Sequence, residues 1–192
     1  MDDVRASKTL SLVLRHDPGS VGITLDGHGW VPIPDVLDGL ERAGRAISRE
    51  QLDRIVASSD KQRFAVDEQQ DRIRANQGHS VQVDLELKPE VPPAALFHGT
   101  PVRNIAAIRE HGLKKMARHA VHLSADRATA AKVGSRLGAF VVLEVFAAQL
   151  SRDGTEFFRS DNGVWLVDSV PPQYIRAAVN PSRNAVGRLS ER

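Results

Sequence analysis

Apolar side chains recur at helical spacing in three segments of the first 60 residues. The first such segment ends in the polar run Arg15-His16-Asp17, directly before Pro18. Ser48 and Gln51 form a capping box at the start of the third segment, which predicts a helix beginning there. The first predicted helix covers residues 7–15. The second begins with residues 35–40, and the third begins at residue 48.

Alternating polar and apolar positions predict strands around these helices. Residues 30–33 suit a short strand, and the segments 62–67 and 71–77, joined by the polar sequence EQQ, predict a β-hairpin. Three helices and a hairpin in this order describe a winged helix. That architecture often binds nucleic acid, but a fold by itself assigns no function.

The second half of the chain alternates short apolar strands with helices. Gly112 is positioned to end a helix that runs through Ile105 and Ile108. The pattern therefore predicts a mixed α/β unit dominated by sheet. Its predicted strands cover residues 95–100, 120–124, 139–146 and 163–170, and a second helix lies near residues 128–133.

The whole pattern predicts an α+β chain with two lobes. The sequence KPEVPPAAL, with prolines at 89, 92 and 93, is typical of a stiff connector. The end of the chain has few large apolar residues and is predicted to be a flexible tail. The predicted units are a winged-helix lobe at 1–88, a proline-rich linker at 89–94, a sheet-rich lobe at 95–178 and the tail at 179–192.

Composition narrows the chemistry. The 192 residues include no cysteine, which excludes disulfides, thiolate nucleophiles and cysteine-ligated metals. No apolar run approaches the roughly 20 residues that span a bilayer, and the sequence MDDVRASK lacks a signal-peptide pattern. We therefore expect a cytoplasmic protein with no membrane partner. Residues 1–88 carry 12 Lys and Arg against 15 Asp and Glu, and residues 89–192 carry 14 against 9, so charge changes sign at the connector.

Three arginines stand in polar clusters that packing does not require, namely Arg15 beside His16, Arg63, and Arg118. A guanidinium stays protonated, and its planar fork matches phosphate oxygens. No Asp-x-Asp or Glu-x-x-His pattern indicates a metal site, so we expect metal-free chemistry on phosphate. The structural alternatives are a cationic pair in the last turn of a helix, favoured by the helix dipole, and a solvated strand charge at Arg63.

Other polar positions fit either a functional role or a purely structural one. His98 fits either a site or a capped junction between strand and helix, and His122 fits either a site or a satisfied core histidine. Residues 76–78 and 162–163 have turn composition, and Trp165 is typical of a core position.

Taken in order, the motifs LSLVLRHDP, DKQRF, IRANQGHS, HGT, RHAVHLS, SDNGVWL and VPPQYI closely resemble the RNA 2′-phosphotransferase family over about residues 7–175. The resemblance implies an N-terminal winged-helix RNA lobe and a C-terminal lobe of the ADP-ribosyltransferase fold. It implies a 2′-phosphorylated RNA partner, with tRNA the substrate that the family name suggests. It also implies NAD+ as a consumed co-substrate, and we expect a monomer.

The implied reaction has two steps. The RNA 2′-phosphate attacks the anomeric carbon of the nicotinamide ribose, which expels nicotinamide and leaves an RNA-2′-phospho-ADP-ribose intermediate. The ribose 2″-hydroxyl then attacks phosphorus, giving ADP-ribose 1″,2″-cyclic phosphate and an RNA 2′-hydroxyl.

By the same resemblance, each motif assigns roles to residues of this chain. Related folds carry a glutamate where Val164 stands here, and its absence suits a phosphate nucleophile, which is already an anion and needs only orientation. His16 is the catalytic candidate able to exchange protons near neutral pH. The implied roles are catalysis for Arg15, His16, Arg63 and Arg118; NAD+ binding for His98, Gly99, Thr100, His122, Ser124, Arg136 and Val164; and phosphate contact between the lobes for Gln77, His79 and Ser80.

Two other functions stay open at this point. A related ADP-ribosyltransferase would cap a terminal phosphate of RNA or DNA and stop after the first step. A winged-helix regulator would bind nucleic acid without turnover, and sequence-specific duplex binding would reveal it.

Overall fold

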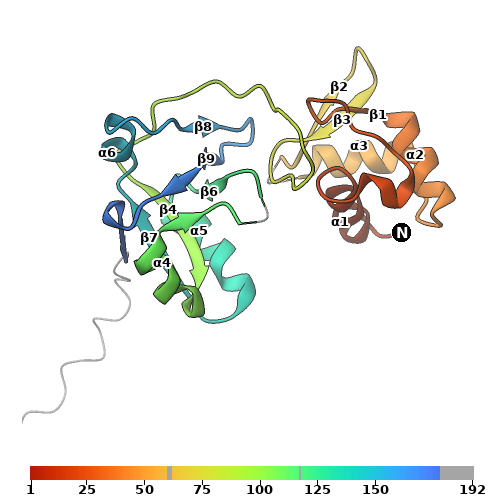
Figure 1. Cartoon of the computed structure of the whole chain (residues 1–192). Coiled ribbons are helices and arrows are strands. Elements are labelled where there is room, and N and C mark those ends of the chain that lie inside the picture. Colours follow the sequence, from red (N-terminus) through yellow and green to blue (C-terminus); the bar gives the residue numbers. More distant parts are fainter. Residues whose placement is uncertain (60–61, 117, 178–192) are drawn as a thin grey trace, which may run out of the picture.

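The computed structural model describes residues 1–59, 62–116 and 118–177. The described chain is α+β, as the sequence predicts, and it contains six α-helices and several small sheets. Most of its buried apolar residues form two separate clusters, one drawn from residues 6–75 and the other from residues 96–170. Figure 1 shows the corresponding two lobes, joined by a long connecting segment. No helix in this part of the chain is long and apolar enough to cross a membrane.

The N-terminal lobe contains three helices, as predicted, but with different bounds for the first. Helix α1 begins four residues earlier than predicted and ends two residues earlier. The Ser48 hydroxyl accepts the Gln51 N–H at 3.2 Å and confirms the predicted start of α3. The Gln51 side-chain amide donates to Asp3 at 2.8 Å and to the Met1 carbonyl at 2.8 Å, which connects the start of α3 to α1. The helices are α1 (Asp3–Val13), α2 (Ile33–Arg42) and α3 (Arg49–Ala57).

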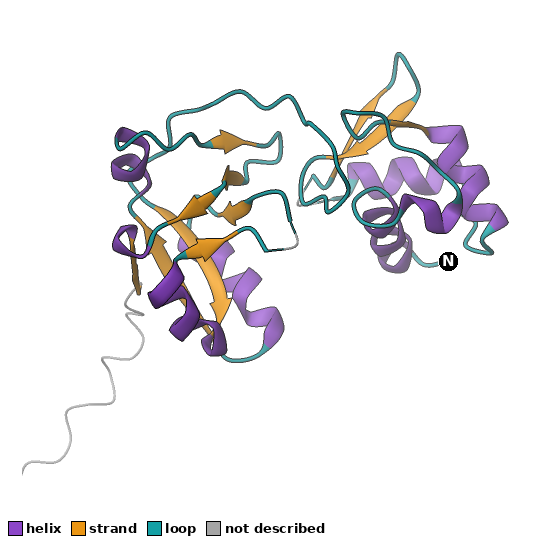
Figure 2. Ribbon diagram, viewed as in Figure 1, coloured by secondary structure: helices purple, strands orange, loops and turns teal. Residues whose placement is uncertain are grey.

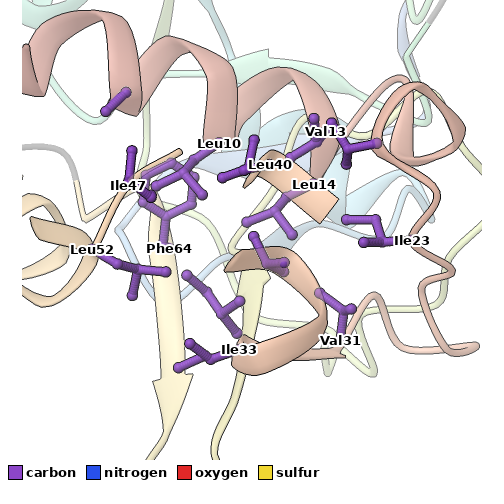
Figure 3. Close-up of a cluster of buried hydrophobic side chains, with 14 of the residues drawn as sticks. Leu10, Val13, Leu14, Ile23, Val31, Ile33, Leu40, Ile47, Leu52 and Phe64 are labelled. Carbon is purple, nitrogen blue, oxygen red and sulfur yellow. The ribbon is translucent and has the colours of Figure 1, made fainter. Parts of the chain in front are cut away.

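The predicted hairpin is confirmed, and the short first strand joins it. The three strands lie in the order β1–β3–β2, all antiparallel, with Phe64 opposite Ala75. Figure 2 shows the three helices packed below this sheet. Leu10, Ile33, Leu52 and Phe64 meet in the core between them (Figure 3). The strands are β1 (Val31–Pro32), β2 (Phe64–Asp67) and β3 (Arg72–Ala75).

The C-terminal lobe contains two three-stranded sheets with the orders β11–β7–β4 and β6–β9–β8, and one strand pair, β10–β5. A bridge between Phe97 and Ser124 connects β4 to the end of β6. The strands are β4 (Leu96–Pro101), β5 (Leu113–Lys114), β6 (Val121–Leu123), β7 (Phe140–Val145), β8 (Phe158–Arg159), β9 (Trp165–Val167), β10 (Ser169–Val170) and β11 (Ile175–Ala177). The helices are α4 (Ile105–His111), α5 (Arg127–Gly134) and α6 (Ala147–Arg152).

Several predictions for this lobe need correction. The strand predicted at 163–170 is two strands, β9 and β10, with a break at Asp168. The sequence analysis missed α6 and β8, which are too short to show a clear period. Strand β11 extends past Ile175, where fraying was expected, because it pairs with β7. The predicted tail, 179–192, lies outside the described residues.

The segment between the lobes contacts each of them in turn. The Asp84 N–H donates to the Gly27 carbonyl at 2.8 Å, whereas the Glu90 N–H donates to the Phe157 carbonyl at 2.8 Å. The chain therefore leaves the N-terminal lobe after Asp84 and reaches the other before Glu90. The domain limits at 88–89 and 94–95 stay predictions.

Helix α5 lies directly against β4 because two glycines face each other there. A Cβ atom on Gly99 would lie 1.9 Å from the Ala130 carbonyl oxygen, and one on Gly134 would lie 3.2 Å from the Gly99 backbone. Neither backbone can yield without moving the helix. Gly99 is therefore required by packing, whatever further role its backbone has.

We predict that Gly99→Ala destabilises the protein by about 2 kcal/mol or more, since overpacking a tight contact typically costs 1–3 kcal/mol. Urea unfolding measures the change. Gly27→Ala is the matched control, because a Cβ atom there meets nothing within 4 Å. Equal unfolding midpoints for the two variants would contradict the packing argument.

Candidate active site

Arg15 and His16 lie in the turn that follows α1. The Leu12 carbonyl accepts the N–H groups of His16 at 2.9 Å and Asp17 at 3.0 Å, which closes the turn. The prediction that the pair occupies the last helical turn is wrong, because α1 ends at Val13. Both residues lie just past the C-terminal end of α1, where the helix dipole still favours a cation, so the contacts of their side chains must decide between the two interpretations.

Arg15 is half-buried and held at both its backbone and its side chain. Its carbonyl accepts the N–H groups of Ser80 at 2.9 Å and Val81 at 3.3 Å, and its Nη2 donates to the Arg63 carbonyl at 3.3 Å. Gly78, in the left-handed region with φ of +87°, leaves the space beside the guanidinium open. A Cβ atom on Gly78 would lie 3.8 Å from Arg15 Nη1 and 3.9 Å from His122 Nε2. The two lobes therefore meet at this glycine.

The three candidate arginines form a cationic cluster. Burial, and then repulsion by Arg63 and Arg118, lower the pKa of Arg15 to about 10. Arg63 lies just before β2, rather than on the hairpin as expected, and its Nη1 lies 3.5 Å from the Ser59 hydroxyl. Within the described residues, none of the three guanidiniums forms an ion pair with a carboxylate. The positive charge that Arg63 and Arg118 add beside Arg15 makes this place a candidate anion site.

His16 is exposed at the edge of this cluster. Its Nδ1 lies 3.0 Å from the Ser80 hydroxyl. Partial burial, followed by the charges of Arg15 and Arg118, lowers the pKa of His16. A neutral imidazole is thus favoured until an anion enters, at which point the opposite charge would favour protonation.

Two neighbouring strands of the C-terminal lobe carry His98 and His122. The His98 Nδ1–H donates to the His122 carbonyl at 3.0 Å, and the His122 Nδ1–H donates to the Ala120 carbonyl at 3.0 Å. Because a carbonyl only accepts, these bonds assign the proton of each neutral ring to Nδ1. Burial and Arg118 lower the pKa of His122 to about 4.

His122 Nε2 is therefore a hydrogen-bond acceptor. It is buried, and no described residue donates to it. A hydroxyl or amide group of a ligand would satisfy it.

The other predicted NAD+ contacts are more dispersed. Thr100 is buried and its hydroxyl accepts from Asn104 at 3.2 Å, while the Ser124 backbone pairs with Phe97. Arg136 is exposed in a short 3₁₀ turn beyond α5. Val164 was expected within a strand, but it lies in the turn directly before β9. The next residue, Trp165, is the first of that strand and pairs with Leu123.

Two of the three residues predicted between the lobes, Gln77 and His79, line a small cavity of about 50 Å³, whereas Ser80 does not. Gln77, Gly78 and His79 line one side, and His119 and His122 are among the residues that line the other. His79 is only 2% exposed, and its Nε2 has no partner among the described residues. The cavity is large enough for a water molecule between these polar groups.

The sequence analysis missed a direct contact between the lobes. The Arg74 guanidinium lies 4.6 Å from the centre of the Trp30 ring and 3.7 Å from the Asp161 carboxylate. Arg74 belongs to β3, and Asp161 to the turn that contains Val164. In the sequence, Arg74 and Asp161 stand out only as parts of the motifs RANQ and SDNG. Neither motif indicates that the two side chains are in contact.

The burial of His79 predicts how the free energy of unfolding depends on pH. Burial, and then the charge of Arg15, lowers the pKa of His79 to about 4, from an ordinary value near 6.5. The unfolded chain therefore binds a proton as pH falls from 6.5 to 4 while the folded chain does not. The titration of His79 should therefore lower the free energy of unfolding by on the order of 3 kcal/mol between pH 6.5 and pH 4. Above pH 6.5 it should have no effect.

His79→Leu should therefore flatten the fall in unfolding free energy between pH 6.5 and pH 4. Urea unfolding at a series of pH values measures it. His111→Leu, an exposed position at the end of α4, is the control. If both variants keep the wild-type slope, His79 does not titrate as its burial requires.

Sequence comparisons identify relatives along most of the chain. Residues 1–169 match the family model described as RNA 2′-phosphotransferase, Tpt1 / KptA family. A probable RNA 2′-phosphotransferase of Streptomyces griseus is 51% identical over 179 residues, covering 90% of this chain and 95% of the relative. Those of Burkholderia pseudomallei and Nostoc punctiforme are each 50% identical, covering 90% of this chain and 94% and 96% of the relatives. The chain therefore belongs to the RNA 2′-phosphotransferase, Tpt1 / KptA, family of enzymes.

Proposed function

We propose that this enzyme removes an internal 2′-phosphate from RNA by transferring it to NAD+. The observation that carries the proposal is the cationic cluster, in which the charges of Arg63 and Arg118 act on the Arg15 guanidinium, and no carboxylate among the described residues pairs with any of the three. A phosphate dianion would relieve that repulsion and accept hydrogen bonds from several guanidinium groups at once. Family membership supports the same substrate, since the relatives are named RNA 2′-phosphotransferases.

In this proposal, the N-terminal lobe is a winged helix that holds RNA, and the C-terminal lobe is an ADP-ribosyltransferase-like fold that holds NAD+. His122 offers NAD+ a buried acceptor at Nε2, which fits a ribose hydroxyl or the nicotinamide amide. His98 fixes the strand beside it. Because Gly78 separates Arg15 from His122 by so little, a phosphate on one lobe would face a ribose on the other.

The two chemical steps make different demands on the cluster. In the first step, the phosphate is already an anion, so the arginines need only hold it near the anomeric carbon. In the second step, charge builds on phosphorus and the departing RNA 2′-oxygen must gain a proton. The arginines stabilise that charge, and His16, poised beside Arg15, supplies or relays the proton.

We predict that His16→Ala slows the second step about 10²–10⁴-fold, the usual contribution of general acid–base catalysis. Arg15→Ala should slow it about 10²–10³-fold, as for loss of one oxyanion donor. The first step should suffer less, so RNA-2′-phospho-ADP-ribose should accumulate. Denaturing gels of radiolabelled 2′-phosphorylated RNA with NAD+ resolve the intermediate from the substrate and the product.

His111→Ala, an exposed position at the end of α4 and outside the cluster, serves as the control and should turn over like wild type. Release of ADP-ribose 1″,2″-cyclic phosphate at the wild-type rate by both His16→Ala and Arg15→Ala would overturn the proposal. A wild-type enzyme that stops at the ADP-ribosylated RNA would instead be a phosphate-capping ADP-ribosyltransferase.

A further inference from the structure

A second groove leaves the cationic cluster along the N-terminal lobe. It has a volume of about 540 Å³ and lies between α1 and the C-terminal end of α3. His16 and Arg63, both part of the proposed phosphate site, also line this groove. The groove is therefore continuous with the place where the 2′-phosphate is proposed to sit.

One wall of the groove is a single face of α1. Val4, Lys8 and Leu12 follow one another at intervals of four residues and stack along the helix, with Ser7 and Ser11 beside them. Val4 is 66% exposed and Leu12 is 41% exposed, although α1 otherwise buries its apolar side chains. An exposed apolar surface flanked by hydroxyl groups suits the face of a nucleobase together with its ribose.

The charge of the groove favours a polyanion. Lys8 is exposed and forms no ion pair within the described residues, and Arg63 lies at the cluster end. The acid that lines the groove, Asp3, pairs with Arg54 at 3.1 Å and accepts a hydrogen bond from Gln51 at 2.8 Å. Among the described residues, Lys8 and Arg63 are then the unpaired charges that line the groove.

We propose that this groove binds the RNA chain next to the 2′-phosphorylated nucleotide. Lys8 and the hydroxyls of Ser7 and Ser11 would contact a phosphodiester, while Val4 and Leu12 would contact a base. The inference rests on the proposed function, because it places the 2′-phosphate at the Arg15–His16–Arg63 end. According to this proposal, the enzyme contacts the neighbouring nucleotide of the RNA in addition to the phosphate that it removes.

Binding without NAD+ tests the groove separately from catalysis. The probe is a fluorescent pentanucleotide RNA with a 2′-phosphate on its central nucleotide, followed by anisotropy. Unlabelled adenosine 2′-phosphate, which has no neighbouring nucleotide, competes for the cluster alone. Lys8→Glu and Ser7→Glu should each weaken pentanucleotide binding about tenfold and leave the inhibition constant of adenosine 2′-phosphate unchanged.

Salt dependence gives a second readout. Lys8→Ala should reduce the slope of log affinity against log salt by about 0.7, the value for one phosphate contact on a single strand. Arg45→Glu is the control, since Arg45 is an exposed cation of the same lobe that does not line the groove. All variants should keep the wild-type unfolding midpoint, because the substituted side chains lie at the surface.

Unchanged pentanucleotide affinity in both Lys8→Glu and Ser7→Glu would overturn the proposal that the groove binds RNA. Equal weakening of both ligands would also overturn it, because the substitutions would then act on the cluster. Turnover of the same pentanucleotide with NAD+ tests the proposed function independently. A wild-type protein that binds the RNA through Lys8 without transferring its phosphate would refute that function and leave the groove intact.

Discussion

The positive charge that Arg63 and Arg118 add beside the half-buried Arg15 is the constraint on which the candidate site depends. Burial and the charges of Arg63 and Arg118 bring the pKa of Arg15 down to about 10, so the folded chain pays for a cluster that no described carboxylate neutralises. The fold keeps the cluster in place through backbone hydrogen bonds, above all from Ser80 and Val81 to the Arg15 carbonyl. A bound phosphate would offset this repulsion, which is why we propose that the cluster selects an anion.

The position of the cluster explains why two lobes are needed. Arg15 and Arg63 come from the N-terminal lobe, and Arg118 comes from the loop between β5 and β6 of the other lobe. The segment 77–80 lies between them and brings Arg15 close to His122 across Gly78. A phosphate carried by one lobe and a ribose carried by the other would then react where the lobes meet, and catalysis would consist largely of orientation.

Local signals in the sequence predicted much of the fold. The start of α3 follows from Ser48, and the hairpin follows from alternation around EQQ, because capping and turn formation depend on near neighbours. Strand β11 was missed because it exists only by pairing with β7, where Arg176 also meets Glu144 at 2.9 Å. For the candidate site, the motifs predicted roles for Arg15 and His122, and the structure places the two residues on either side of Gly78. The sequence could not show that Arg15 lies outside α1, or that a carbonyl fixes the tautomer of His122, because both depend on distant backbone.

The most direct test of the cationic cluster compares two RNAs that differ only in one 2′-phosphate. Without NAD+, the wild-type protein should bind the 2′-phosphorylated RNA at least about tenfold more tightly than the 2′-hydroxyl RNA, since each charge-assisted hydrogen bond contributes roughly 1.5–3 kcal/mol. Arg15→Ala, Arg63→Ala and Arg118→Ala should each reduce that preference while leaving the affinity for the 2′-hydroxyl RNA nearly unchanged. An undiminished preference for the 2′-phosphate in a protein carrying all three substitutions would contradict the account.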